Sequence, residues 1–144
     1  MFIGEHSHTL DSKNRLAIPA KFRDQLGKKA VITRGLDESL QLYPTKSWEE
    51  IAQKLGNMSI GEGGARSFVR LMLSGASEVS LDRLGRILVP QYLKDYAKLK
   101  KDTIVNGLFN RIEIWEKTNW NKYKAKAEKD STKVAEKLGE LGIF

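Results

Sequence analysis

The sequence predicts an α+β fold built from two tandem copies of one small unit, related by a pseudo-two-fold axis and sharing one core. A motif of the form Leu-Asp-x-x-x-Arg-x-x-x-Pro occurs twice, at residues 10–19 and 81–90. Similar residues continue beyond each motif, in the order strand–turn–strand–helix–strand–strand–helix. A unit of about 45 residues buries too little apolar surface to fold alone, so we expect the two copies to pack against each other.

Each motif is expected to form two short strands joined by a tight turn, as in a hairpin. In the first copy, Leu10, Leu16 and Ile18 are the apolar residues that mark the strands on either side of the turn. Asn14 suits a left-handed position in this turn, and Gly85 occupies the equivalent position in the second copy. The two turns are therefore expected at the tips of equivalent hairpins.

A short helix and two more strands are expected to follow the first motif. Pro19 can open the helix as its first residue, and Gly27 ends it. Ser47-x-x-Glu50 is a capping-box pattern, which predicts the start of a second helix. The strands between the two helices are expected at residues 30–33 and 40–43.

A linking region separates the two copies. Residues 56–64 are rich in glycine and are the most loop-like stretch of the chain. Apolar residues at helical spacing then predict an amphipathic helix over 65–76. We therefore divide the chain into a first repeat (5–48), linking helices with a glycine-rich loop (49–75), a second repeat (76–120) and a C-terminal helix (121–144).

The second copy follows the first at a spacing of 71 residues, which becomes 72 after one inserted residue. At the spacing of 72, Gly35 matches Gly107 and Trp48 matches Trp120. Tryptophans at equivalent positions favour packing in the core or between subunits over stacking on bases. Thr118 is the expected cap of a longer final helix. The other elements of this copy are expected at 79–81, 86–89, 92–99 (a helix), 103–105 and 112–115.

Composition narrows the class of protein. The chain has 144 residues and no cysteine, so disulfide frameworks and thiolate metal sites are excluded. Because there is no signal peptide and no apolar run near the ~20 residues needed to cross a bilayer, we expect a soluble cytoplasmic protein without a membrane partner. The formal net charge of +7 favours a polyanionic partner such as nucleic acid but does not require one.

An enzyme is the main rival to a binding protein. His6 and His8 would share one face of a strand, where they could bind a metal together with Glu5. Two histidines without a convincing third ligand favour a structural or surface role instead. The chain has no phosphate-binding loop and no nucleophile elbow. The sequence therefore favours a protein without catalytic activity, cofactor, metal or small-molecule substrate.

The repeated turn has a structural and a functional interpretation. Its Asp can accept backbone N–H groups and its Arg can pair with that carboxylate, which could be a purely structural device. Alternatively, cations at the two tips could bind DNA, because Arg and Asn match base edges and a two-stranded ribbon fits the major groove. The cationic and polar residues at the tips are Lys13, Asn14, Arg15, Arg83 and Arg86.

The doubled motif, preceded by Gly4-Glu5-His6, resembles the MraZ family, which belongs to the AbrB-like group of swapped-hairpin transcription factors. The resemblance covers essentially the whole chain. It implies a DNA-binding regulator that assembles into a ring of subunits. It also implies contact with short direct repeats in its own promoter, at the head of the bacterial division and cell-wall gene cluster. The chain departs from the family at Asn14, where glycine is usual.

We therefore expect two AbrB-like repeats that form a sequence-specific regulator of transcription, bound to double-stranded DNA and associated with the nucleoid. Several subunits acting on repeated sites are expected to be needed for useful affinity, because one subunit offers few cations. The alternative is an RNA-binding or scaffolding module that assembles into oligomers. The expected DNA contacts are Arg15 and Arg86, assisted by Lys13, Asn14 and Arg83, and the turn-shaping residues are Asp11, Asp82 and Gly85.

Overall fold

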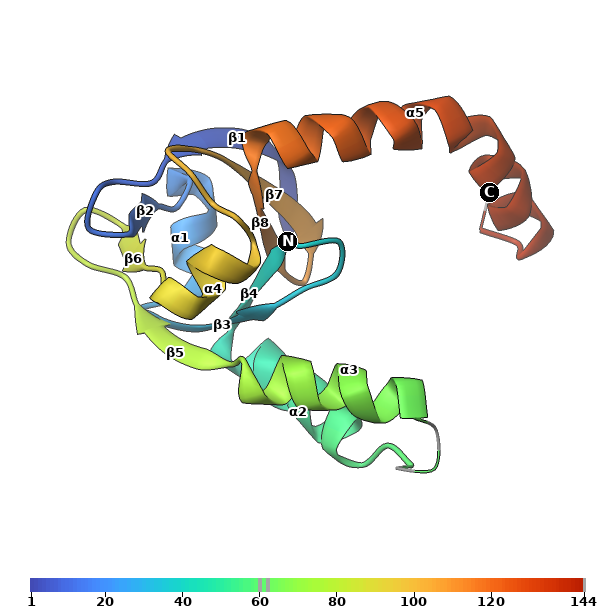
Figure 1. Cartoon of the computed structure of the whole chain (residues 1–144), viewed down its shortest axis with the longest axis horizontal. Coiled ribbons are helices and arrows are strands. Elements are labelled where there is room, and N and C mark those ends of the chain that lie inside the picture. The colour runs from blue at the N-terminus through green and yellow to red at the C-terminus, as the bar shows by residue number, and fades with distance from the viewer. Residues whose placement is uncertain (60, 62, 144) are drawn as a thin grey trace.

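The computed structural model describes residues 1–59, 61 and 63–143, and within them strands and helices alternate as the repeat predicts (Figure 1). The strands are β1 (Phe2–Thr9), β2 (Arg15–Ala17), β3 (Lys29–Arg34), β4 (Leu40–Pro44), β5 (Ser77–Ser80), β6 (Arg86–Leu88), β7 (Asp102–Phe109) and β8 (Ile112–Glu116). The helices are α1 (Ala20–Leu26), α2 (Thr45–Gly56), α3 (Gly63–Ser74), α4 (Gln91–Tyr96) and α5 (Lys117–Glu140). The α+β class is confirmed.

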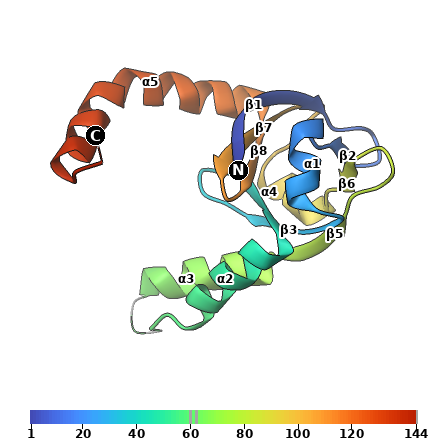
Figure 2. The same ribbon diagram turned by 180° about the vertical axis from the view of Figure 1, so that it is seen from behind.

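One antiparallel sheet and one short ribbon hold the two halves together. The six-stranded sheet has the order β1-β7-β8-β4-β3-β5, and β2 and β6 form a separate two-stranded ribbon. The ribbon, α1 and α4 cover the inner face of the sheet (Figures 1 and 2). The core between these layers takes apolar side chains from both halves, among them Leu16 and Ile87, which have no exposed surface. The prediction of one shared core is confirmed.

The predicted hairpins are wrong, because the strands of each motif pair with the other half of the chain. β2 pairs with β6, and β1 pairs with β7 over its whole length. Within the first motif, an isolated bridge between Leu10 and Leu16 and the hydrogen bonds of the turn itself connect the two sides, without forming a local strand ladder. The exchange places Leu16 opposite Ile87 at the centre of the ribbon. This pairing buries both side chains over the core, which favours it over a local hairpin.

The spacing between equivalent residues changes twice rather than once. In the turn after β3, the backbone N–H of Gly35 donates to Ser39, and in the turn after β7 that of Leu108 donates to Arg111. Gly35 is therefore equivalent to Leu108, and its predicted match with Gly107 is wrong. Two residues are inserted before β7, and the turn after β7 is one residue shorter than its counterpart.

The predicted beginnings of three helices also differ from the structure. Pro19 lies one position before α1 rather than in it. The helix α2 begins two residues before Ser47 and has no capping bond from a side chain, because its N-cap is Pro44, whose side chain has no hydrogen-bond acceptor. The cap of α5 is Glu116, whose carboxylate accepts the backbone N–H of Thr118. The capping roles predicted for Ser47 and Thr118 are therefore wrong.

Two helical arms project from the outer face of the sheet, in different directions (Figures 1 and 2). The first arm is formed by α2 and α3, and the second by α5. At the base of each arm, aromatic rings pack together: Tyr43 against Trp48 at 5.7 Å between ring centroids, and Trp115 against Trp120 at 5.2 Å. The equivalent tryptophans thus anchor the arms on the sheet.

The segment between the helices of the first arm is shorter than the predicted loop, because α2 runs to Gly56 and α3 already begins at Gly63. Ile60 and Glu62, which belong to that predicted loop, lie outside the described residues. The predicted division of the chain after residues 48, 75 and 120 stays a prediction. No helix in the described part of the chain is long and apolar enough to cross a membrane.

Candidate nucleic-acid interface

The first motif turn is closed by its own carboxylate. Asp11 Oδ1 accepts the backbone N–H of Lys13 at 2.9 Å and that of Arg15 at 2.8 Å. Asp11 Oδ2 accepts Arg15 Nε at 2.7 Å. The backbone N–H of Asn14 donates to Asp11 O at 3.0 Å, with a φ of 62° at Asn14. Asparagine tolerates this left-handed conformation better than most residues do.

The second motif turn has the same geometry. Asp82 Oδ1 accepts the backbone N–H of Leu84 at 2.9 Å and that of Arg86 at 2.9 Å. Asp82 Oδ2 accepts Arg86 Nε at 2.8 Å. Gly85, with a φ of 73°, donates its backbone N–H to Asp82 O at 3.0 Å. Each bond of the first turn therefore has a counterpart in the second.

The ribbon places the two motif arginines on one exposed face. Arg15 lies opposite Leu88, and Ala17 lies opposite Arg86. Because side chains alternate along a strand, Arg15 and Arg86 point to the same side, on diagonal positions whose Cα atoms lie about 7–8 Å apart. Between them, Leu16 points into the core. The ribbon lies at one end of the molecule, and the two turns extend beyond it (Figure 1).

Each motif arginine is oriented by its aspartate but is not enclosed. The side chains of Arg15 and Arg86 keep 35% and 27% of their surface exposed. Only the Nε atom of each donates to the carboxylate. Within the described residues, the terminal nitrogens of the two guanidinium groups have no acceptor, so they can donate to a ligand on the ribbon face.

The two aspartates are held in the charged form. Hydrogen bonds from the backbone and side chain of Arg15 lower the pKa of Asp11, and those of Arg86 lower the pKa of Asp82. Backbone N–H groups of Lys13 and Leu84 act in the same direction. The turns are therefore stabilised at every pH at which these carboxyl groups are ionised.

The opposite half of the chain supports the first turn through α4. Asn14 Nδ2 donates to Gln91 Oε1 at 2.9 Å, and Lys94 Nζ donates to Asn14 Oδ1 at 3.0 Å. Both partners belong to the second half of the chain. The turn is thereby attached to a helix that lies 77 to 80 residues away in the sequence.

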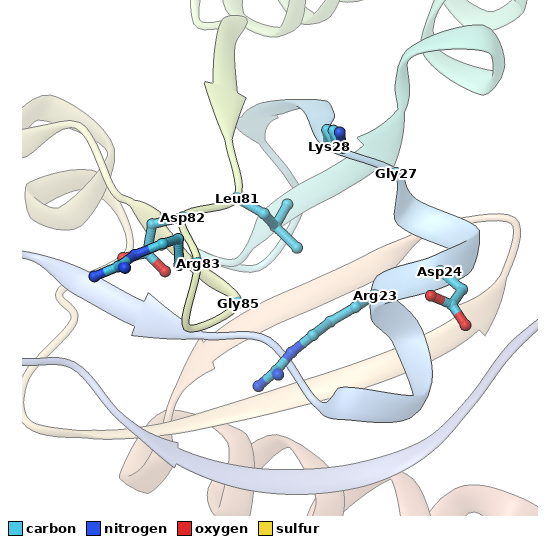
Figure 3. Close-up of a pocket in the computed structure, with 8 residues that line it drawn as sticks. All are labelled: Arg23, Asp24, Gly27, Lys28, Leu81, Asp82, Arg83 and Gly85. Carbon is cyan, nitrogen blue, oxygen red and sulfur yellow. The ribbon is translucent and has the colours of Figure 1, made fainter.

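The second turn is supported by α1 of the first half, through a different contact. The side chain of Arg23 extends from α1 toward the second turn (Figure 3), and any Cβ at Gly85 would overlap its guanidinium group. Arg23 Nε donates to the carbonyl oxygen of Ile18 at 2.9 Å. Arg23 and Lys94 occupy equivalent positions at the spacing of 71 residues. This match of two cations was the available signal, and the sequence reasoning missed it.

The remaining predicted contact residues lie on the tips. Lys13 and Arg83 are exposed, and Arg83 extends from its turn past Asp82 (Figure 3). Asn14 is half-buried, and its side chain is held by Gln91 and Lys94 of α4. The structure thus brings all five predicted contact residues to one end of the molecule.

The histidines of β1 lie away from Glu5. His6 packs its ring edge-to-face against Phe22 at 5.1 Å on the inner face of the sheet, and burial lowers the pKa of His8. Glu5 lies on the outer face, where it accepts Trp120 Nε1 at 2.9 Å. Glu5 therefore cannot bind a metal together with both histidines. No group of three histidine, aspartate or glutamate side chains in the described residues is placed to bind a metal.

Comparisons with known proteins agree along the whole chain. A family model described as "MraZ protein, putative antitoxin-like" matches residues 1–71 and again 72–140. A relative from Clostridium beijerinckii is 49% identical over 143 residues, covering 99% of this chain and 100% of its own length. One from Clostridium acetobutylicum is 48% identical over 143 residues with the same coverage. One from Desulforamulus reducens is 46% identical over 141 residues, covering 98% of this chain and 99% of its own. Each is named "Transcriptional regulator MraZ".

Proposed function

The chain belongs to the MraZ family, and we propose that it is a transcriptional regulator that binds double-stranded DNA in a sequence-specific manner through the exposed face of the β2–β6 ribbon. The relatives carry the name of a transcriptional regulator and not of an enzyme. A non-catalytic DNA-binding protein agrees with that name and needs no cofactor.

One observation carries the proposal: Arg15 and Arg86 lie on the same exposed face of one ribbon. A two-stranded ribbon fits the major groove of B-DNA, which is about 12 Å wide. Arginine can donate to O6 and N7 of guanine with two nitrogens at once. A single ribbon with two oriented arginines can therefore contact neighbouring bases in one groove.

Within this site the residues have distinct proposed roles. Arg15 and Arg86 contact bases or the backbone, and Asp11 and Asp82 hold the turns and pair with the arginines when DNA is absent. The assisting contacts are Lys13, Asn14 and Arg83, and Gly85 keeps the backbone of the second turn in its left-handed conformation.

The proposed regulator acts as a homo-oligomer, arranged as a ring. The second arm supports this, because α5 has 24 residues and none of them is buried. Its apolar residues Tyr123 and Val134 are 44% and 51% exposed. Helices in proteins are stabilised mainly by the packing of an apolar face, so a second copy of the chain is the proposed partner of this arm. A ring then presents several ribbons to repeated sites, which raises the affinity of the assembly.

The proposed target is a set of short direct repeats in the promoter of the division and cell-wall gene cluster, including the protein's own gene. The family resemblance supports this target, and a promoter-bound regulator is proposed to act in the cytoplasm, at the nucleoid. Direct repeats suit a ring, because each subunit meets the same sequence in the same orientation.

Fluorescence anisotropy with the promoter duplex of its own gene and a scrambled duplex tests the function. Wild-type protein should prefer the promoter duplex. Arg15→Ala and Arg86→Ala should each weaken that preference by about 1–3 kcal/mol for a lost base contact. Lys54→Ala, which removes an exposed cation from the first arm, is the control and should leave the preference unchanged.

Two results would contradict the proposal. Equal affinity of the wild-type protein for the promoter and scrambled duplexes would exclude sequence-specific regulation. Tighter binding of single-stranded RNA than of either duplex would favour the RNA-binding alternative. Light scattering tests the oligomer separately, and a monomer at micromolar concentration would contradict the ring.

A further inference from the structure

Two cationic pockets lie beside the two turns, and neither is lined by the motif arginines Arg15 and Arg86. The pocket at the first turn has a volume of about 660 Å³, and it is lined by Asp11 together with Lys94, Lys100 and Lys101. In each pocket the turn belongs to one half of the chain and most of the cations to the other. The pocket at the second turn has about 500 Å³ and is lined by Asp82 and Arg83 together with Arg23 and Lys28 (Figure 3).

The internal repeat makes these pockets equivalent. The carbonyl oxygen of Lys28 accepts the backbone N–H of Leu81 at 2.9 Å, and that of Lys101 accepts the backbone N–H of Leu10 at 2.8 Å. Lys28 and Lys101 therefore occupy the same position at the start of their respective sheet strands. Arg23 and Lys94 are equivalent as well, on α1 and α4. Both halves thus place a cation at the same two positions.

The charge of each pocket is not cancelled by its own aspartate. Asp11 pairs with Arg15 and Asp82 pairs with Arg86, both within the turn. The carboxylate of Asp24, which also lines the second pocket, lies on the side of α1 away from the turn (Figure 3). Lys28, Lys100 and Lys101 are exposed, and within the described residues none of them forms an ion pair. The pockets therefore suit an anion.

The positions of the pockets indicate which anion. They flank the β2–β6 ribbon at its two ends, beyond Arg15 and Arg86. Three residues in a strand span about 10 Å, close to the width of the major groove of about 12 Å. A ribbon that lies in the groove with its turns at the rims brings each pocket to a phosphate strand.

We propose that the two pockets are binding sites for the phosphodiester backbone of duplex DNA, and that each turn depends on cations lent by the opposite half of the chain. This inference rests on the proposed function, because it assumes that the ribbon face meets DNA. It divides the interface into a face that reads bases and two rims that bind phosphate without regard to sequence.

The test compares the salt dependence of binding for the wild-type chain and two matched double variants. Lys100→Ala/Lys101→Ala removes two exposed cations from the first pocket, and Lys46→Ala/Lys54→Ala removes two exposed cations from the first arm. Anisotropy is measured with the promoter duplex and with a scrambled duplex between about 50 and 200 mM salt. Circular dichroism and light scattering verify that fold and assembly are unchanged. Lys28→Ala extends the test to the second pocket.

The proposal predicts that Lys100→Ala/Lys101→Ala lowers the slope of log K against log salt by about 1 for each lost phosphate contact, equally on both duplexes. The preference for the promoter duplex should stay as in the wild type, and the control should keep the wild-type slope. An unchanged slope for the pocket variant, or an equal change in the control, would overturn the proposal that the pockets bind phosphate. The proposed sequence-specific binding through the ribbon face would stand. If the wild type shows no sequence preference, the proposed function fails, and the slopes on either duplex still decide the pockets.

Discussion

The two motif turns are alike in framework and different in support. Both are closed by an aspartate that accepts two backbone N–H groups and the Nε of the motif arginine, with matching distances differing by no more than 0.1 Å. The first turn is attached to α4 by the side chain of Asn14, whereas the second has Gly85 and the guanidinium of Arg23 packed against it.

The comparison separates the contacts that are the same in both copies of the turn from those that differ. The bonds within each turn orient the arginine, so both copies keep them. The contact with the opposite half needs only to hold the turn in place, and two chemistries achieve this: a polar side chain that meets Lys94, and a missing side chain that admits Arg23. The two copies therefore differ both in the residue at the left-handed position and in the cation beside it.

The largest effect is expected when the second turn receives a side chain. Gly85→Ala should lower the free energy of unfolding by about 2–5 kcal/mol, because left-handed strain costs about 1–2 and overpacking about 1–3 kcal/mol. Denaturant unfolding measures the loss. In an Arg23→Ala background the overpacking part should disappear, and an identical cost in both backgrounds would show that Arg23 is not what fills the space beside Gly85.

The next effect concerns DNA binding and should be equal in the two turns. Arg15→Ala and Arg86→Ala should each weaken binding to the promoter duplex by about 1–3 kcal/mol, because their aspartates orient them in the same way. Both variants should unfold at nearly the wild-type denaturant concentration. A large loss of binding for only one of them would show that the two turns share their hydrogen bonds but that only one arginine contacts DNA.

The loss of folding stability at low pH should depend equally on the two turns. Because the folded state lowers the pKa of both Asp11 and Asp82, their contribution to stability is present above the pKa of the unfolded chain, about 3.9 for aspartate. It is lost as the pH falls through the lower folded pKa. Asp11→Asn and Asp82→Asn should each flatten the fall in stability below about pH 4. Urea unfolding across this pH range measures the free energy of unfolding. If either variant loses stability at low pH as steeply as the wild type, the role of that carboxylate is contradicted.

The smallest effect is expected from Asn14→Gly, which gives the first turn the residue of the second. The backbone φ of 62° suits glycine, while the exposed bond to Gln91 and the half-buried bond to Lys94 are lost. These effects oppose each other, so the free energy of unfolding should change by less than about 1 kcal/mol. Amide exchange of the turn should become faster. Exchange at the wild-type rate would show that the link to α4 does not order the turn.

Much of the fold could be predicted from the sequence, since the alternation of apolar and polar residues and the residues that end strands and helices are local properties. Leu16 and Ile18 indicated a strand, Gly27 a helix end, and Asn14 and Gly85 a left-handed turn. The partner of each strand could not be predicted, because alternation shows which face of a strand is buried and not which edge it pairs with. The apolar pattern is therefore equally compatible with two local hairpins and with the observed pairing of β2 with β6.

The same limit applies to the candidate site. The motif arginines and the cations on the tips are close in sequence, so spacing was enough to group them. Arg23 and Lys94 reach the turns only because the halves exchange strands. The equivalence of Lys28 and Lys101 was hidden by the two residues inserted before β7, and only the backbone bonds of Leu81 and Leu10 reveal it.

The most direct test of the ribbon face uses the absence of cysteine from the chain. Leu88 lies opposite Arg15 and is 60% exposed, and Leu71 on α3 is 50% exposed. Leu88→Cys and Leu71→Cys each introduce one thiol without changing a motif arginine, and the rate of alkylation is measured with and without duplex. The promoter duplex should slow the alkylation of Leu88→Cys far more than a scrambled duplex of equal concentration, and should leave Leu71→Cys unaffected. Equal rates for Leu88→Cys with and without a saturating promoter duplex would contradict the claim that the β2–β6 ribbon meets DNA.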